Sequence, residues 1–238
     1  MKIRILADNY TFDKKFKECW GFSVLINDDI LFDTADSPET FLHNVQMMNI
    51  DLSLIKKVVI SHDHWDHVGG LEALFKENSN VLLYGLKGFS DDFRERAVKC
   101  NIKLIENEDF SEIDKGIFTS EPFKTTYKQS QLVEQALILK ISKGLVIILG
   151  CAHPGVIQMT EAIKKHFNDK IYCVMGGFHL ESKTENEIKD IASKLQKLGV
   201  CKIAPTHCTG QKAIDLFSKL YSDNFLRLKT GLEIEVQF

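Results

Sequence analysis

The stretch VVISHDHWDHVGG, residues 58–70, organises the rest of this chain. It opens with a β-branched apolar run typical of a buried strand and runs into LEALFKE, which has the pattern of a helix. Between strand and helix lie three histidines and two aspartates. In an extended loop, His62 and His64 can face one point, and the adjacent Asp66 and His67 can turn toward a second. The stretch therefore predicts a loop that holds two metal ions.

The residue types in this loop are those that bind transition metals. Imidazole nitrogen and carboxylate oxygen are the ligands that zinc accepts at about 2.0 to 2.2 Å, and catalytic sites keep one position open for water. A polar surface loop would explain one histidine but gives no reason for HxHxDH directly after an apolar strand. We therefore expect one or two zinc ions, with manganese or iron as the alternatives, because the ligand set is nitrogen-rich with a carboxylate.

Length and composition limit the classes of protein. At 238 residues and 44% hydrophobic, the chain is long enough for one large domain, and we expect residues 1–238 to form it. A formal net charge of -3 offers no basic surface for a nucleic acid or an anionic membrane. There is no leader-like start and no run of about 18 apolar residues. We expect a soluble, cytoplasmic protein with a small-molecule substrate; its oligomeric state is left open.

Six cysteines are scattered through the chain without a CxxC pair, so we expect reduced thiols. Cys151 and Cys208 lie beside histidines. We interpret both as small buried packing residues, with a role as soft metal ligands as the alternative.

The first part of the chain predicts a β meander. Apolar strands are expected at 3–5, 22–26 and 30–32. Asp33 follows in LFDTAD, where its carboxylate could accept a hydrogen bond from the far nitrogen of a metal-bound imidazole or could cap the next turn. Spacing alone leaves both roles open.

Strands and helices then alternate as in an α/β layer. A helix is expected to begin at Ser37 and Pro38 and to bury one face made of Phe41, Leu42, Val45 and Met48. The pattern loosens over residues 110–131, where we interpret TYKQSQ as a polar loop over a pocket. A hairpin at 137–149 restores the alternation.

Three later strands share one arrangement of residues: a buried run, a small-residue turn and then a histidine. Strand 145–149 leads to His153, strand 171–175 to His179, and strand 200–204 to His207. If these strands lie side by side and parallel, their carboxyl ends gather the histidines where open α/β sheets place their sites. We therefore predict that His153 and His207 are metal ligands.

Together these residues resemble the metallo-β-lactamase superfamily, whose pattern is HxHxDH, then a His, usually an Asp, and a His. The resemblance covers nearly the whole chain. It implies an α/β fold, a four-layer αββα sandwich of two mixed β-sheets flanked by helices, with a dinuclear site at one edge. Carried over by motif, the ligands are His62, His64 and His153 for the first metal, and Asp66, His67 and His207 for the second. Asp33 then orients a ligand through a hydrogen bond.

One position departs from the superfamily pattern. His179, in MGGFHL, stands where a bridging aspartate is usual, and a histidine cannot bridge two metals as a carboxylate does. Three roles are open for His179: it binds one metal, it donates a hydrogen bond to a substrate oxyanion, or it acts as an acid and base. We favour the substrate or proton-transfer role, because His179 follows a Gly176-Gly177 turn that we expect to be flexible. Asp66 and His179 are thus the expected catalytic residues.

The segments GCAHPG, GGFHL and HCTG are similar to a subgroup that includes dihydropterin ribofuranosylaminobenzene phosphate synthase and metal-dependent hydrolases. The first hypothesis is a hydrolase that uses a metal-activated water on an ester, lactone or phosphodiester. The second is a transferase of the synthase type, which joins a pterin diphosphate to an aromatic ribosyl phosphate. The third is a non-catalytic metal or ligand sensor. The sequence leaves the substrate open.

Overall fold

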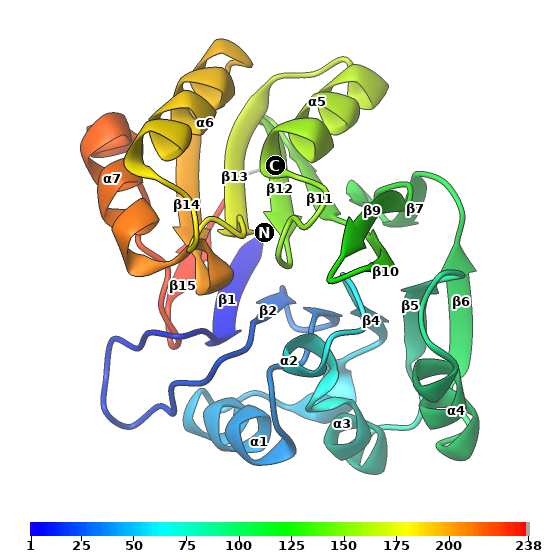
Figure 1. Ribbon diagram of the computed structural model, residues 1–238. Helices are drawn as coiled ribbons and strands as arrows, with labels where there is room; N and C mark the ends of the chain where they lie inside the picture. The colour runs from blue at the N-terminus through cyan, green and yellow to red at the C-terminus, as the bar shows by residue number, and fades with distance from the viewer. Residues whose placement is uncertain (237–238) are drawn as a thin grey trace. The chain divides into compact units, whose positions relative to one another are not determined.

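The structure, a computed structural model, describes residues 1–236 and divides into two compact units (Figure 1). The first unit comprises Met1–Asp109 and Lys229–Val236, and the second comprises Phe110–Leu228. Each unit contains one large mixed sheet with helices, so the predicted mixed α/β class is confirmed. That the whole chain folds as a single domain stays a prediction. Among the described residues, no helix is long and apolar enough to cross a membrane.

The sheet of the first unit has the strand order β15-β1-β2-β3-β4-β5-β6. Its strands are β1 (Lys2–Ala7), β2 (Ser23–Ile26), β3 (Ile30–Phe32), β4 (Lys57–Val59), β5 (Leu82–Leu86), β6 (Lys103–Asn107) and β15 (Glu233–Glu235). Neighbours from β15 to β3 are antiparallel, which confirms the predicted meander. Neighbours from β3 to β6 are parallel. The apolar run of the histidine-rich stretch is therefore a central, parallel strand.

The helices of the first unit follow the predicted alternation. They are α1 (Pro38–Met47), η1 (Leu52–Leu54), α2 (Trp65–Val68), α3 (Leu71–Glu77) and α4 (Asp91–Lys99). Ser37 caps α1 by accepting the Thr40 N–H, as Ser before a first-turn Pro predicts. The predicted apolar stripe of α1 is partly wrong, since Leu42 is 37% exposed. Asn44 is buried instead, because its amide bonds both backbone groups of Lys17.

The second unit has a six-stranded sheet, β14-β13-β12-β11-β8-β7, and a two-stranded sheet, β10-β9. Its strands are β7 (Ser111–Asp114), β8 (Ile117–Thr119), β9 (Phe123–Tyr127), β10 (Ser130–Glu134), β11 (Leu137–Ile141), β12 (Gly144–Leu149), β13 (Ile171–Gly177) and β14 (Lys202–Thr206). Strands β12, β13 and β14 are adjacent and parallel. The predicted parallel arrangement of the three strands that end before histidines is therefore confirmed.

The predicted loop TYKQSQ is instead the turn of the β9–β10 hairpin. Tyr127 pairs with Ser130 across a two-residue turn, and Lys128 and Gln129 have φ values of 46° and 67°. Such turns need positive φ at both central residues and usually carry Asn-Gly. Because the turn residues here are Lys and Gln, the sequence pattern does not indicate a hairpin.

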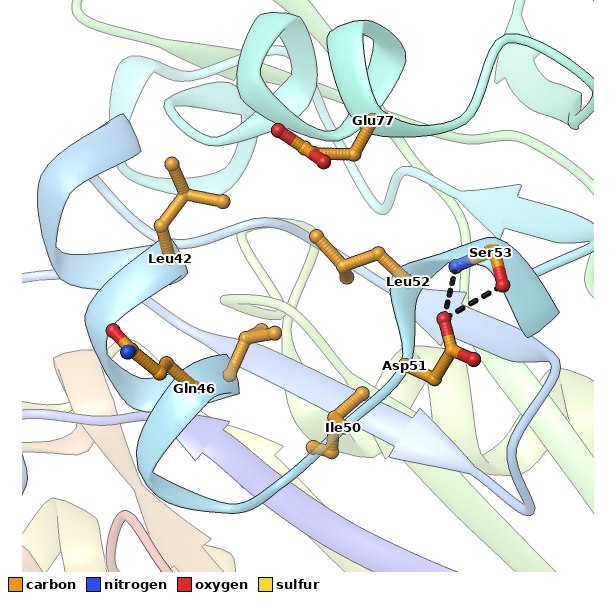
Figure 2. Close-up of a pocket in the computed structure, with 8 residues that line it drawn as sticks. Leu42, Gln46, Ile50, Asp51, Leu52, Ser53 and Glu77 are labelled. Carbon is orange, nitrogen blue, oxygen red and sulfur yellow. Dashed lines mark hydrogen bonds between the residues drawn. The ribbon is translucent and has the colours of Figure 1, made fainter.

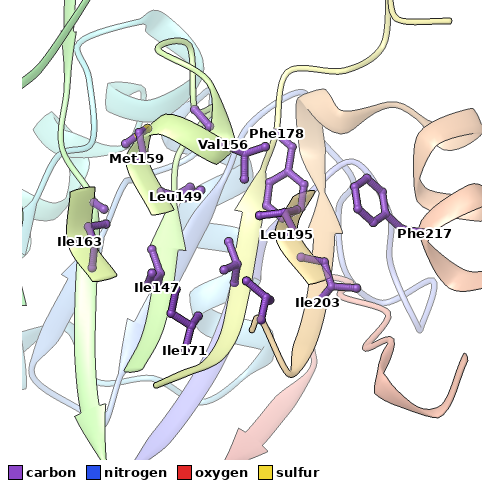
Figure 3. Close-up of a cluster of buried hydrophobic side chains, with 14 of the residues drawn as sticks. Ile147, Leu149, Val156, Met159, Ile163, Ile171, Phe178, Leu195, Ile203 and Phe217 are labelled. Atoms are coloured by element: carbon purple, nitrogen blue, oxygen red, sulfur yellow. The ribbon is translucent and has the colours of Figure 1, made fainter. Parts of the chain in front are cut away.

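Three helices pack on the six-stranded sheet of the second unit and form its core (Figure 3). They are α5 (Val156–Phe167), α6 (Glu185–Lys197) and α7 (Gln211–Tyr221), and short η2 (His207–Thr209) and η3 (Ser222–Asn224) flank α7. Thr184 and Glu187 form a capping box at the start of α6. Phe178 and Phe217 are fully buried in this core. The packing fixes the ends of β12, β13 and β14, where the histidines follow.

Candidate functional site

The histidine-rich loop of the first unit was expected to be extended, but part of it is helical. His64 precedes the short helix α2, and the His67 N–H donates to the His64 carbonyl to close its turn. The ring centroid of His62 lies 4.6 Å from that of His64 and 4.1 Å from that of His67. Asp66 Oδ2 and His67 Nε2 are 3.7 Å apart. Four of the predicted ligands are therefore gathered within this loop.

Asp33 makes the predicted hydrogen bond to a histidine of this loop. It is fully buried, and its Oδ2 lies 2.7 Å from His67 Nδ1. Its two oxygens also accept the backbone N–H and the hydroxyl of Ser61, both at 2.7 Å. Burial raises the pKa of Asp33, against the opposing effects of His67 and Ser61. The carboxyl is thus held by three donors, and its orientation is fixed.

This network also sets the tautomers of two imidazoles. The Ser61 hydroxyl donates to Asp33, so its oxygen is an acceptor for His62 Nδ1, which lies 2.9 Å away. His67 Nδ1 donates directly to Asp33. In both rings the hydrogen is therefore assigned to Nδ1, which leaves the lone pair on Nε2. A neutral imidazole with a held Nδ1–H is the form that binds a metal.

In the second unit, the predicted histidines follow the ends of three adjacent strands. His153 follows β12, His179 follows β13, and His207 begins η2 directly after β14. His207 is fully buried, whereas His179 is half-buried. Both have a φ of 52°, a left-handed conformation that costs a non-glycine residue about 1 to 2 kcal/mol. Strain of this kind collects at functional sites.

Glu134, at the end of β10, is a buried carboxylate that organises the loop before His153. It is fully buried and accepts the backbone N–H groups of Cys151, Ala152 and His153 at 2.7 to 2.9 Å. Its Oε2 also lies 3.1 Å from His153 Nδ1. Burial opposes its ionisation, but the bonds to His153 and Cys151 outweigh burial and lower the pKa of Glu134. His153 is thus oriented in the second unit as His67 is in the first.

His179 lies beside His153, and the ring of Tyr127 contacts both imidazoles edge-on. The centroids of the two imidazoles are 4.6 Å apart, and the Tyr127 ring is 4.7 Å from His153 and 5.3 Å from His179. A hydrogen bond with Cys208 is the main cause that raises the pKa of His179. Its Nδ1 has no hydrogen-bond partner within residues 1–236. One ring nitrogen of His179 is therefore buried without a hydrogen-bond partner among the described residues.

The glycines before His179 are not the flexible turn that the sequence analysis expects. Gly176 and Gly177 are the last residues of β13, paired with β14. A Cβ on Gly177 would lie 2.3 Å from the Gly150 carbonyl oxygen and 2.7 Å from Cys208 Sγ. These glycines allow close packing, so the backbone that leads to His179 is rigid.

Two residues that contact these histidines, Glu134 and Tyr127, are not predicted by the motifs of the sequence. A glutamate inside the apolar run LVEQALIL was the available signal for Glu134, since a charged residue is rarely buried without a specific partner. Tyr127 gave no signal, because its position depends on the unrecognised hairpin.

We predict that Asp33→Asn and Glu134→Gln each weaken metal binding by about 10 to 100-fold, the usual cost of losing a group that orients a ligand. An amide places one NH₂ where the carboxylate now accepts an N–H. Metal affinity is measured by competition with a chromophoric chelator. Asp63→Asn is the matched control, because Asp63 lies in the same loop but accepts the Ser90 N–H. Affinities within two-fold of the unmodified protein for both test variants would contradict the prediction.

A cavity of about 460 Å³ lies elsewhere in the first unit (Figure 2). It is lined by α1, by η1 with the loop before it, and by Glu77 of α3. Asp51 faces Ser53 and accepts its N–H and hydroxyl, so it caps η1. None of the predicted site residues lines this cavity, and it adds nothing to the candidate site.

Comparison with known proteins agrees with the motifs. Residues 8–138, slightly more than half of the chain, match the family model of the anti-Pycsar protein Apyc1. The 7,8-dihydropterin-6-methyl-4-(β-D-ribofuranosyl)-aminobenzene-5'-phosphate synthase of Methanocaldococcus jannaschii is 30% identical, over 97% of this chain and 95% of the relative.

Solved structures extend the likeness to the fold. Tm1679, described as a metal-dependent hydrolase of the β-lactamase superfamily, has a TM-score of 0.86 and 31% identity, with both chains fully covered. YhfI from Bacillus subtilis, a metallo-β-lactamase fold protein, has a TM-score of 0.70 and 14% identity over 98% of each chain, which shows the fold alone. The metallo-β-lactamase-like fold predicted from the motifs is thereby confirmed. The chain belongs to the family of the anti-Pycsar protein Apyc1 and, by its likeness to Tm1679, to the metallo-β-lactamase superfamily.

Proposed function

We propose that this protein is a metal-dependent hydrolase that binds two divalent ions. Zinc is the preferred metal, with manganese or iron as the alternatives. One observation carries the proposal: in each unit, a buried carboxylate accepts the Nδ1–H of an imidazole. Asp33 does so for His67, and Glu134 does so for His153. Each buried carboxylate accepts this N–H and so favours the tautomer that leaves the Nε2 lone pair for a metal. The donor set therefore fits metal binding.

The residues proposed to hold the metals carry over from the family motif. They are His62, His64 and His153 for one ion and Asp66, His67 and His207 for the other. When bound, such ions would lower the pKa of a coordinated water toward 7 and would polarise the bond to be hydrolysed. Asp33 and Glu134 keep the imidazoles in the tautomer that offers Nε2, so the ligands are oriented before the metals bind.

His179 is proposed to contact the substrate. Its ring is half-buried, its Nδ1 has no hydrogen-bond partner within residues 1–236, and the aromatic ring of Tyr127 lies beside it. An imidazole in this setting can donate a proton to a leaving oxygen or hold an oxyanion. The substrate class that suits these groups is a small ester, lactone or phosphodiester. The proposed substrate is a small molecule rather than a nucleic acid, in line with the net charge of -3, and the proposed location is the cytoplasm.

A transferase is the second candidate, and the M. jannaschii synthase favours it. In that reaction class the metals would stabilise a leaving diphosphate, and His179 would contact an anionic oxygen. A hydrolase consumes water and forms two smaller products, whereas a transferase requires a second organic substrate. The two candidates therefore differ in whether product formation depends on an acceptor.

The test combines metal analysis with a substrate panel. We expect protein prepared without chelator to carry one to two equivalents of a transition metal. Loaded protein is then assayed on generic esters, lactones and phosphodiesters, and on a pterin diphosphate with and without an aromatic ribosyl phosphate. Turnover of the panel supports the hydrolase, and turnover that requires both pterin and acceptor supports the transferase. Folded protein with no bound metal would overturn the proposal in both forms, and metal without turnover would favour a sensor.

A further inference from the structure

One cluster of side chains in the second unit contains a thiol that is not among the ligands proposed above. Cys151, His153 and His179 each offer one ligand atom, and these three atoms lie within 4.8 Å of one another. Cys151 is only 3% exposed. The thiol of Cys151 and the imidazole of His153 are therefore a sulfur and a nitrogen donor at ligand spacing, of the kind that zinc accepts, and His179 lies beside them.

Cys151 is held in place by the residues that hold His153. Its backbone N–H donates to Glu134 Oε1 at 2.9 Å, and its carbonyl oxygen lies 3.7 Å from Cys208 Sγ. The next residue, Ala152, has a φ of 54°. Glu134 thus fixes the thiol and the imidazole in one loop, and the left-handed residue between them sets their relative direction.

Charge is the second argument. The six ligands carried over from the motif include one carboxylate, Asp66, while two divalent ions bring four positive charges. The superfamily pattern supplies a second carboxylate at the position of His179, and a neutral imidazole does not replace its charge. A thiol that binds a metal loses its proton, so it adds one negative charge and a soft donor.

We propose that Cys151 is a metal ligand that supplies the negative charge of the absent aspartate. This inference rests on the proposed metal-binding function. On binding, the S–H bond breaks, a metal–sulfur bond forms, and the proton passes to solvent. Among residues 1–236, Cys151 is the one cysteine that lies in a cluster of three or more metal-ligating side chains. Cys173 is equally buried, on β13, without such neighbours.

The test uses the full chain loaded with Co²⁺, whose absorption reports the ligands without any assay of activity. We expect a thiolate-to-cobalt charge-transfer band in the near ultraviolet, beside the visible bands of bound cobalt. Cys151→Ser should remove the charge-transfer band and keep the visible bands. It should also weaken Cd²⁺ binding by more than the roughly 10 to 100-fold typical of losing an orienting group. Cys173→Ser is the matched control and should retain the band.

X-ray absorption of the zinc-loaded unmodified protein gives a second measurement that needs no variant. We expect one sulfur neighbour at about 2.3 Å, the usual Zn–S distance. Zinc or cobalt that binds with nitrogen and oxygen neighbours alone would overturn the role of Cys151 and leave the proposed function standing. A band that persists in Cys151→Ser and disappears in Cys208→Ser would assign the ligand to Cys208 instead. Failure of the unmodified protein to bind cobalt or zinc would overturn the proposed function itself.

Discussion

His62→Ala and His153→Ala are each expected to give a folded protein that has lost at least one metal ion and all measurable turnover. Each change removes a proposed ligand, one from each unit, and leaves the other residues of its loop in place. The Ser61 hydroxyl and the Glu134 carboxylate lose one hydrogen bond each, which costs about 1 to 3 kcal/mol where the group stays buried. Apolar cores of this size do not depend on a metal to fold.

The measurements are metal content by elemental analysis, turnover of the substrate that the panel identifies, and thermal unfolding. Two histidines outside the site give matched controls. His43→Ala lies on α1, where the ring contacts the Lys15 carbonyl, and His166→Ala lies on α5, where the ring stacks on Phe110. Both should keep metal and activity. If His62→Ala and His153→Ala retained full metal content, the ligand assignment carried over from the motif would be wrong.

His179→Asp is expected to keep the metals and to lower kcat by about 10²-fold or more, the usual scale for losing a general acid or base. The aspartate restores the side chain common in the superfamily, so a residue that served only as a ligand would tolerate it. An imidazole that moves a proton or holds an oxyanion would not. The close packing around Gly177 is expected to keep the backbone of the variant in place.

His179→Ala and His179→Gln separate the remaining roles. Both should retain metal, and Gln should recover part of the activity if the imidazole acts as a hydrogen-bond donor to the substrate. Metal content, kcat and KM are measured for all three variants. Loss of metal together with activity in both His179→Ala and His179→Asp would identify His179 as a ligand and overturn its assignment as an acid or base.

Much of the fold was predictable because local and long-range signals agree. Strands that end in a small residue and a histidine recur in the chain, and buried parallel strands are continuous apolar runs that can be read directly. Helix starts such as Ser37 and Thr184 carry capping residues with their own signature. The hydrogen bond that His67 donates to Asp33 was one of two roles that spacing left open for this carboxylate, and the resemblance to the superfamily favoured it.

The features that were missed depend on contacts between segments far apart in the chain. Glu134 is 19 residues from His153, and only the β9–β10 hairpin brings its carboxylate to the backbone of that loop. Tyr127 reaches the histidines through a turn without glycine. Leu42 was assigned to the buried face of α1 from the periodicity of apolar residues. That periodicity does not show that the Asn44 amide can be buried by hydrogen bonds with the distant backbone of Lys17. In each case a polar side chain met its partner through tertiary structure.

The pairing of β15 with β1 affects how the chain can fold during synthesis. Lys2 pairs with Glu235 and Arg4 with Glu233, so the edge of the first sheet is closed by a segment made after the whole second unit. Until that segment leaves the ribosome, the outer edge of β1 presents unpaired backbone groups that can join another chain. Completion of the first sheet therefore waits for synthesis of a segment that follows the whole second unit. Loss of residues 229–236 would leave that edge permanently open to aggregation.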